Sequence, residues 1–296
     1  MTATPPQQLR SLIDQPGILA LPGAFDALSA RLAEQAGFEA VFTSGFGISA
    51  TTLGLPDMGM LTMAENTDRV GHITRSLDVP LVADMDTGYG NVLNVRRTMQ
   101  ECVDAGVAGV ILEDQEWPKK CGHMNEKRVV DTEEHVRRIR AAADVREERD
   151  HEFVIIGRTD AREPHGLEEA IQRGHAYEDA GADVVFVEAP ESRDELERIA
   201  DEFDAPTFAN MVEGGKTPFL EAAELEAIGF DIVVFPLSAL FAATNAIQQA
   251  YEQLHETGTT GGVEGVSFAD FEDVIDAESF RDQEQRYANM DVPDGE

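Results

Sequence analysis

Short apolar runs alternate with longer amphipathic stretches along most of the chain. The apolar runs are rich in Val, Ile and Leu and show no polar alternation, which is typical of strands buried on both faces of a parallel sheet. The amphipathic stretches between them, such as residues 26–37 and 93–106, end in glycine, the usual helix stop. The pattern predicts eight strands, at Ile18–Pro22, Ala40–Ser44, Leu81–Asp86, Gly109–Glu113, Val154–Arg158, Val184–Glu188, Thr207–Asn210 and Ile232–Pro236.

Eight strands with helices between them predict the α/β class and a (β/α)8 TIM barrel. A doubly wound open sheet is the alternative, because strand order cannot be read from a sequence. We assign residues 1–257 to a catalytic barrel domain and residues 258–296 to a Gly- and Thr-rich linker, one C-terminal helix and a frayed tail. That helix has an apolar side, formed by Phe268, Phe271, Ile275 and Phe280. It either packs back on its own barrel or is swapped onto a neighbouring subunit of a homo-oligomer.

The chain is strongly acidic. Its 23 basic and 57 acidic residues give a formal net charge of −34 over 296 residues. Such a surface repels nucleic-acid phosphates and anionic membranes, so we expect neither as a partner. The acidic residues are spread over helix faces, as in proteins of halophiles. We therefore expect a halophilic source and a stability that rises with salt.

The cysteines and the N-terminus bear on where the protein works. Cys102 and Cys121 are too few for a disulfide framework, and Cys102 lies in a helical stretch where it suits the core. The first residues lack an apolar signal region, and the chain has no run of about 18 apolar residues. We expect a soluble, cytoplasmic protein.

Polar side chains end six of the eight predicted strands. They belong to Thr43–Gly45, Asp84–Asp86, Glu113–Asp114, Arg158–Asp160, Glu188 and Asn210. In a barrel these strand ends meet at one rim, where active sites of this fold lie. Turn formation alone would not require six polar sets on the same rim. The sequence therefore predicts a functional site there.

Three of these acids suggest a metal site. Asp84 and Asp86 are two apart on one predicted strand, so their side chains should share a face, and Glu113 ends the next strand. Crowded carboxylates repel unless a cation neutralises them, and oxygen-rich sets suit Mg²⁺. The simpler interpretation, a turn at Asp86 and a cap at Asp84, leaves the three acids crowded together. The histidines and cysteines lack zinc-site spacing.

The loop after the fourth strand carries the most reactive residue types. Lys119, Lys120, Cys121, Gly122 and His123 are consecutive there. Cations beside a thiol lower its pKa, and glycine allows close approach of the backbone to a ligand. We therefore predict that Cys121 is a proton donor or nucleophile. The segments GYGN and EGGK are not dinucleotide fingerprints and are interpreted as tight turns that line a small-anion pocket.

Six segments resemble the isocitrate lyase and phosphoenolpyruvate mutase superfamily. They are SGFG, LGLPD, ADMDTGYGN, PKKCGH, RTDA and NMVEGGKTP, within residues 44–218, and the resemblance extends from about Pro22 to His255. The pattern K-[KR]-C-G-H marks the carbon–carbon lyases of this superfamily and is absent from its phosphonate mutases. The resemblance implies a (β/α)8 barrel that is commonly tetrameric, with the helix after the barrel exchanged between paired subunits.

The resemblance also assigns roles to residues. It implies that Asp84 binds Mg²⁺, or Mn²⁺, directly and that Asp57, Asp86 and Glu113 hold its waters. Ser44, Gly45 and Gly47 would bind the 2-oxo-acid half of a small carboxylate substrate. The other half would contact Gly122, His123, Arg158, Glu188 and Asn210. Cys121 would be the catalytic acid/base, with its pKa lowered by Lys119, Lys120 and His123.

The implied activity is a Mg²⁺-dependent lyase of the methylisocitrate or 2,3-dialkylmalate type, which releases pyruvate or a similar 2-oxo acid plus a carboxylic acid. The alternatives are a carboxyphosphonoenolpyruvate or phosphoenolpyruvate mutase, an oxaloacetate hydrolase or decarboxylase, and a non-enzymatic binding protein. Superfamily members that cleave methylisocitrate carry arginine at the positions aligned with Phe241 and near Phe268. Phenylalanine there removes charge that a third carboxylate needs, so we expect a preference for dialkylmalates.

Overall fold

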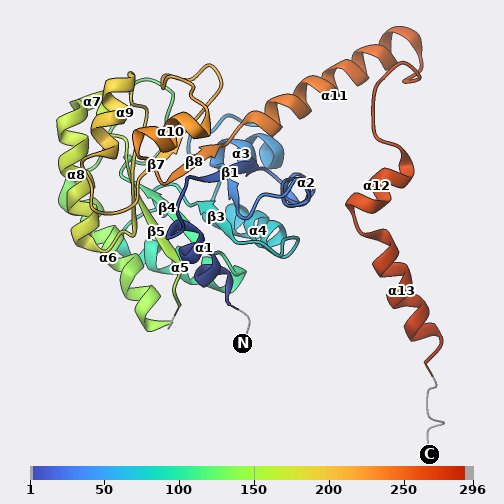
Figure 1. Ribbon diagram of the computed structural model, residues 1–296, viewed down its shortest axis with the longest axis horizontal. Coiled ribbons are helices and arrows are strands. Elements are labelled where there is room, and N and C mark those ends of the chain that lie inside the picture. The colour runs from blue at the N-terminus through green and yellow to red at the C-terminus, as the bar shows by residue number, and fades with distance from the viewer. Residues whose placement is uncertain (1–2, 150, 291–296) are drawn as a thin grey trace, which may run out of the picture. The chain divides into compact units, whose positions relative to one another are not determined.

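The computed structural model describes residues 3–149 and 151–290. They form two compact units, and the first ends at Ala242 and the second begins at Ala243. All eight predicted strands are present in the first unit (Figure 1). Their bounds are β1 (Leu19–Ala24), β2 (Val41–Thr43), β3 (Leu81–Asp84), β4 (Gly109–Glu113), β5 (Val154–Thr159), β6 (Val184–Val187), β7 (Phe208–Asn210) and β8 (Ile232–Phe235).

The strands form one parallel sheet in the order β6-β5-β4-β3-β2-β1-β8-β7. The two outer strands of this order approach each other through a parallel bridge between Val185 and Thr207, and the Val185 amide donates to the Pro206 carbonyl at 3.0 Å. The sheet is therefore a nearly closed barrel. This confirms the predicted (β/α)8 fold and rules out the doubly wound alternative, whose strand order is not sequential.

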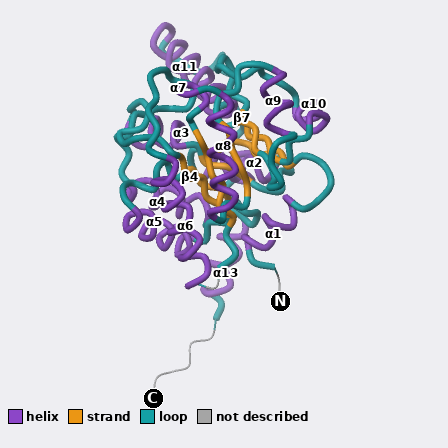
Figure 2. The backbone as a smooth tube through the Cα atoms, turned by 90° about the vertical axis from the view of Figure 1, so that its left-hand side faces the viewer, coloured by secondary structure: helices purple, strands orange, loops and turns teal. Residues whose placement is uncertain are grey.

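Helices follow the strands and surround them (Figure 2). In the first unit they are α1 (Pro5–Ile13), α2 (Ala27–Gln35), α3 (Gly45–Leu53), α4 (Met63–Thr74), α5 (Val92–Ala105), α6 (Thr132–Glu148), α7 (Arg162–His165), α8 (Leu167–Ala180), α9 (Arg193–Ala200) and α10 (Ala222–Ile228), and α11 (Ser238–Thr257) begins there. Helix α5 shows how local sequence sets these bounds. The Asn91 side chain accepts from the amides of Leu93 and Asn94 at its start, and Gly106 ends it with φ 81°.

Two apolar layers hold the first unit together. Inside the barrel, strand residues such as Phe42, Ile156 and Phe208 pack together with Leu9 of α1. Helix α1 was not predicted. Its Leu9 is buried, and Arg10 fixes the helix by donating to Asp183 Oδ1 at 3.0 Å.

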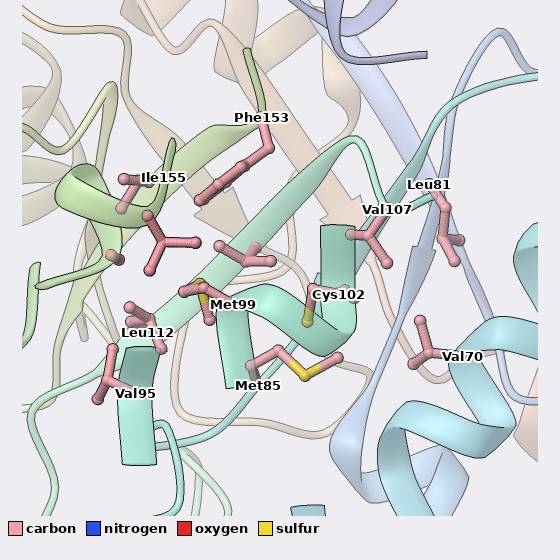
Figure 3. Close-up of a cluster of buried hydrophobic side chains, with 14 of the residues drawn as sticks. Val70, Leu81, Met85, Val95, Met99, Cys102, Val107, Leu112, Phe153 and Ile155 are labelled. Carbon is pink, nitrogen blue, oxygen red and sulfur yellow. The ribbon is translucent and has the colours of Figure 1, made fainter. Parts of the chain in front are cut away.

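The second apolar layer lies between the sheet and helices α4, α5, α6 and α8. Figure 3 shows part of it, with Met99 and Cys102 of α5 among strand residues such as Leu81 and Leu112. Cys102 is buried, which confirms its predicted place in the core. Burial raises the pKa of its thiol to about 12, so this cysteine is chemically quiet.

The second unit contains the rest of α11 and two further helices, α12 (Phe268–Val274) and α13 (Ala277–Ala288). A single C-terminal helix was expected. The chain breaks it at Asp276, whose φ of 56° is left-handed. Phe268 and Phe280 are 81% and 65% exposed, and the swapped arrangement stays a prediction. Within residues 3–149 and 151–290, no helix is long and apolar enough to span a membrane.

Candidate active site

A cavity lies at the C-terminal ends of the barrel strands, and both polar and apolar residues line it. The polar residues are Ser44, Asp57, Asp84, Lys119, Cys121, Gly122, His123, Arg158, Glu188 and Asn210. The apolar residues, together called the apolar wall, are Phe42, Phe46, Ile111, Phe186, Phe208, Val212, Val234, Pro236 and Leu237. All the polar residues were predicted for the site, and the fold brings them together from six strand ends, those of β2 to β7, and the loops that follow.

Four more predicted residues lie behind this lining. The Gly45 amide donates to Asp84 Oδ2 at 3.2 Å, and a side chain at Gly45 would reach within 3.2 Å of both Asp84 and Asp86. A side chain at Gly47 would reach within 3.1 Å of Phe25. The two glycines therefore leave room for neighbours, and their predicted contact with substrate stays a prediction. Asp86 and Glu113 lie in a buried acidic layer beneath the cavity.

The two aspartates after the third strand are close together for a different reason from the one predicted. Strand β3 ends at Asp84, and Asp86 has a left-handed φ of 50°. Strand alternation therefore does not apply to this pair. Instead the chain turns back, and the Asp86 amide donates to Asp84 Oδ1 at 3.1 Å. The turn leaves the Asp84 carboxylate at the cavity and places Asp86 below it.

Lys119 forms ion pairs with two of the buried carboxylates. Its Nζ lies 2.7 Å from Asp57 Oδ1 and 2.6 Å from Asp86 Oδ1, and its side chain is 3% exposed. Burial alone would lower the pKa of Lys119, but Asp86 and Asp57 raise it well above its ordinary value. Burial raises the pKa of Asp86 to about 7, although Lys119 opposes this. Lys119 is therefore paired with these carboxylates and not with the thiol of Cys121.

The acidic layer fits a hydrated divalent cation. Glu113 Oε1 is buried and accepts no hydrogen bond from the described residues, and burial raises the pKa of this carboxyl well above its ordinary value. A water bound to a cation would supply the missing donor. Among the described residues, no three Asp, Glu, His or Cys side chains are arranged to hold an ion directly. Mg²⁺ does not need such a set, because it binds through one or two carboxylates and keeps several waters. Asp84, which faces the cavity, is the candidate direct ligand.

Arg158 is the second buried cation of the site. The strand register pairs it with Glu113, and its guanidinium donates to both oxygens of Asp160, at 2.9 and 3.0 Å. Its Nη2 also lies 3.1 Å from Glu188 Oε2. Burial alone would lower the pKa of Arg158, but Asp160 and Glu188 raise it well above its ordinary value. The guanidinium is thus a fixed positive charge at the cavity.

Asp160 was given no role in the sequence analysis. Burial opposes its ionisation, but Arg158 and Lys127 hold the pKa of Asp160 below its ordinary value. The available signals were its place in the polar set Arg158–Asp160 and in the segment RTDA. Neither signal reveals a partner such as Lys127, which comes from another loop.

His123 is a neutral ring in this arrangement. The Lys216 amide donates to its Nδ1 at 3.1 Å, so the ring proton is on Nε2, which lies 3.5 Å from Glu188 Oε1. Burial lowers the pKa of His123, against the opposing effect of Glu188. The segment EGGK, predicted to form an anion-binding turn, thus packs on this histidine. A side chain at Gly215 would reach within 2.7 Å of it.

The predicted lowering of the Cys121 pKa is wrong. Burial, and after it Asp57, raise the pKa of this thiol to about 11, and the smaller lowering effects of the His123 backbone and Lys119 do not offset them. Of its three predicted cations, Lys119 is paired with carboxylates, His123 is neutral, and Lys120 Nζ donates to the carbonyls of Asn125 and Glu126. Residues adjacent in sequence therefore face different ways. Cys121 is a protonated thiol at the cavity, which is the form that a proton donor needs.

The fold and the rim site define a (β/α)8-barrel enzyme. The sequence profile described as phosphoenolpyruvate phosphomutase matches residues 9–255. The 2,3-dimethylmalate lyase of Eubacterium barkeri is 45% identical over 283 residues, which cover 95% of this chain and 97% of that protein. The 2-methylisocitrate lyase of Bacillus subtilis (strain 168) is 42% identical over 252 residues, which cover 85% and 82%. The chain belongs to the phosphoenolpyruvate phosphomutase family, within the isocitrate lyase superfamily.

Solved structures agree with this assignment. A crystal structure of 2,3-dimethylmalate lyase has a TM-score of 0.93 and 36% identity, and the match covers 100% of this chain and 99% of that one. Oxaloacetate acetylhydrolase in complex with 3,3-difluorooxalacetate has a TM-score of 0.93 and 33% identity, with 98% and 99% covered. Phosphonopyruvate hydrolase, solved with oxalate and Mg²⁺, is 30% identical with a TM-score of 0.86 and coverage of 97% and 100%. A metal ion is thus present at least in this relative.

Proposed function

We propose that the protein is a Mg²⁺-dependent carbon–carbon lyase that cleaves a 2,3-dialkylmalate to pyruvate or a similar 2-oxo acid and a carboxylic acid. The observation that carries this proposal is the cavity itself. It joins a carboxylate suited to a metal, Asp84, a fixed cation, Arg158, and a protonated thiol, Cys121. Mn²⁺ could replace Mg²⁺ at an all-oxygen site. Such an enzyme would work in the cytoplasm.

The reaction follows from these groups. A general base accepts the proton of the substrate hydroxyl, the C2–C3 bond breaks, C2 becomes the carbonyl of the 2-oxo acid, and the bond electrons pass to C3 beside the departing carboxylate. A Mg²⁺ ion bound at Asp84 would supply electrophilic stabilisation of the oxygen on C2. Arg158 stabilises the negative charge that develops on the departing carboxylate. Cys121 Sγ donates its proton to C3, and so completes the carboxylic acid.

The cavity favours alkyl groups over a third carboxylate. Its lysine and arginine, Lys119 and Arg158, are each already within 3.1 Å of two carboxylates. A third substrate carboxylate would be buried without a free partner among these groups, at a cost of several kcal/mol. The apolar wall, with Phe46, Phe186 and Leu237, would instead stabilise an alkyl group by about 0.8 kcal/mol per buried CH₂.

From the sequence alone, this preference was expected because of Phe241. Phe241 lies on α11, is 42% exposed, and is outside the cavity lining formed by the described residues. The expected preference for dialkylmalates is unchanged, but its cause moves to the paired cations and the apolar wall.

A product assay tests the proposal. Formation of 2-oxo acid would be followed with 2,3-dimethylmalate, 2-methylisocitrate, isocitrate and oxaloacetate, with Mg²⁺ and at high salt. We expect the highest kcat/KM for 2,3-dimethylmalate. A tenfold preference for 2-methylisocitrate, about 1.4 kcal/mol, would contradict the substrate argument but not the lyase class. Failure to cleave any of the malates or isocitrates would contradict the proposed class itself.

Oxaloacetate hydrolysis is the second candidate. The similarity to oxaloacetate acetylhydrolase favours it. The same assay separates the two functions, because hydrolysis of oxaloacetate yields oxalate and acetate without any cleavage of alkylmalates. A phosphonate mutase would have no use for the thiol at Cys121.

We infer further that the protein is a homo-oligomer, a tetramer of helix-swapped dimers. The support is the apolar surface of the second unit, where Tyr251, Phe268 and Phe280 are each more than 60% exposed. Such a surface on a monomer would be unfavourable in water. Light scattering at high salt gives the mass directly. A monomer at micromolar concentration would contradict this inference.

A further inference from the structure

One buried lysine of the cysteine loop is not accounted for by the chemistry above. Lys127 has a fully buried side chain, and its Nζ donates to the Gly122 carbonyl at 2.6 Å and to Asp160 Oδ1 at 2.9 Å. Burying a lysine is costly unless it is paired and hydrogen-bonded. An apolar side chain could fill the same space, so the ammonium group has another purpose.

The two acceptors of Lys127 lead to the two halves of the site. Gly122 directly follows Cys121, and it packs so closely that a side chain there would reach within 2.4 Å of Arg158. Asp160 accepts from Arg158 through both carboxylate oxygens. The Lys127 ammonium group therefore joins Gly122, the residue beside the thiol, to Asp160, whose carboxylate orients the Arg158 guanidinium.

One end of this connection is rigid. The Asp160 amide donates to Asp114 Oδ1 at 2.8 Å, and the other oxygen of Asp114 accepts from the side chains of Thr159, Arg173 and Tyr177. Asp160 is thus fixed to the barrel wall. The other end, Gly122, lies in a loop. We expect loss of the Lys127 contacts to release the loop while the barrel keeps its structure.

We propose that Lys127 is a positioning residue, which fixes Cys121 relative to Arg158 so that the thiol proton is delivered where the guanidinium holds the departing carboxylate. The inference rests on the proposed lyase function. Lys127 links the loop to the barrel wall, and neither the Cys121 thiol nor the Arg158 guanidinium makes this link by itself. The distance from Nζ to the reacting atoms does not matter, because Lys127 acts through Gly122 and Asp160.

The loop contains a matched control. Lys120 is next to Cys121, but its Nζ donates only within the loop, to the carbonyls of Asn125 and Glu126, each at 3.3 Å, and to Glu126 Oε2 at 3.5 Å, and its side chain is 29% exposed. Its Nζ has no described contact with the barrel strands. Lys120→Met therefore removes a lysine from the same loop without cutting the connection to Asp160.

The first experiment measures how readily Cys121 is alkylated by iodoacetamide, with each cysteine-containing peptide quantified by mass spectrometry. Cys102, deep in the core, reports global unfolding in the same sample. We expect Lys127→Met to raise the Cys121 rate at least tenfold and to leave the Cys102 rate unchanged. Lys120→Met should stay within twofold of wild type. Because alkylation needs no substrate, this result is independent of whether the lyase proposal is right.

The second experiment is kinetic. With 2,3-dimethylmalate, Lys127→Met should lower kcat at least tenfold and change KM less than threefold, because the proton transfer is disturbed and the metal-side contacts are not. Lys127→Arg, which keeps the cation, should recover most of the loss. If Lys127→Met does not fold, Lys127→Gln serves in both experiments. An unchanged Cys121 alkylation rate, or a parallel rise at Cys102, would overturn the proposal.

Discussion

The two ends of the barrel bury very different side chains. At the N-terminal end, Leu9 of α1 packs on apolar strand residues such as Leu19 and Leu21. At the C-terminal end, the rim buries charged groups such as Glu113, Lys119, Asp160 and others described above, several with strongly shifted pKa values. Apolar burial stabilises a fold without any need for polar partners. Buried charges need well-placed partners and are retained where chemistry requires them. The difference separates the residues that hold the barrel from those that work on a substrate.

The largest expected effect comes from removing a rim carboxylate. Asp84→Ala should abolish Mg²⁺ binding and reduce turnover by roughly 10⁴-fold, since the developing charge on the C2 oxygen would lose its stabilisation. Folding should be preserved, because Asp84 contributes repulsion among buried acids as well as two hydrogen bonds. Calorimetric titration with Mg²⁺ and a product assay check this. A variant that keeps wild-type rates in a chelator would show that the metal assignment is wrong.

At the N-terminal end of the barrel, a core truncation should lower the stability and leave the activity unchanged. Leu9→Ala removes a side chain that is 1% exposed, and comparable core truncations cost about 2–5 kcal/mol in the free energy of unfolding. The site lies at the other end, so kcat should be unchanged at temperatures where the protein stays folded. Urea unfolding and the product assay on the same preparation test both halves. A substantial fall in kcat without loss of stability would contradict the separation of the two ends.

Much of the barrel could be predicted from sequence, because each buried strand leaves a local signal. The run at Gly109–Glu113 is such a case, and its bounds agree with those of β4. Helix α1 was not predicted, because the role of its few apolar residues depends on the N-terminal end of the barrel that they cover. The sequence does not show that contact. At the rim, polar strand ends indicated residues that line the cavity or lie behind it. Their partners could not be predicted, because Lys119 and Lys120 are adjacent in sequence and point to different places.

Substitution of the thiol should have the next largest effect. Cys121→Ser replaces the donor by a far weaker acid, and cleavage should fall by about 10²-fold or more. Binding of pyruvate should change little, because the 2-oxo-acid half is assigned to the Asp84 side of the cavity. Single-turnover cleavage and inhibition by pyruvate measure the two properties separately. An unchanged cleavage rate would show that Cys121 is not the proton donor.

The smallest expected effect concerns a titratable group just behind the rim. It tests how a buried neutral base, unlike the paired charges of the rim, affects stability as the pH changes. His135 of α6 is fully buried, with its ring edge-on to Tyr177 at 4.6 Å between centroids. Burial, and then Arg138, lower the pKa of His135 from 6.5 to about 3. Between these values the unfolded chain binds a proton that the folded protein does not. Stability should therefore fall as the pH drops below about 6.5, by up to about 1.4 kcal/mol per pH unit from this group.

His135→Phe keeps a ring against Tyr177 and removes the titration. The variant should lose less stability than wild type between pH 6 and pH 4.5, with a slope smaller by about one proton. At pH 7.5 the two proteins differ only through packing, because the wild-type ring is neutral in both the folded and most of the unfolded molecules. Urea unfolding at a series of pH values, at constant high salt, gives both slopes. Parallel slopes would mean that His135 is protonated in the folded protein, and that the layer behind the rim tolerates a charge as the rim does.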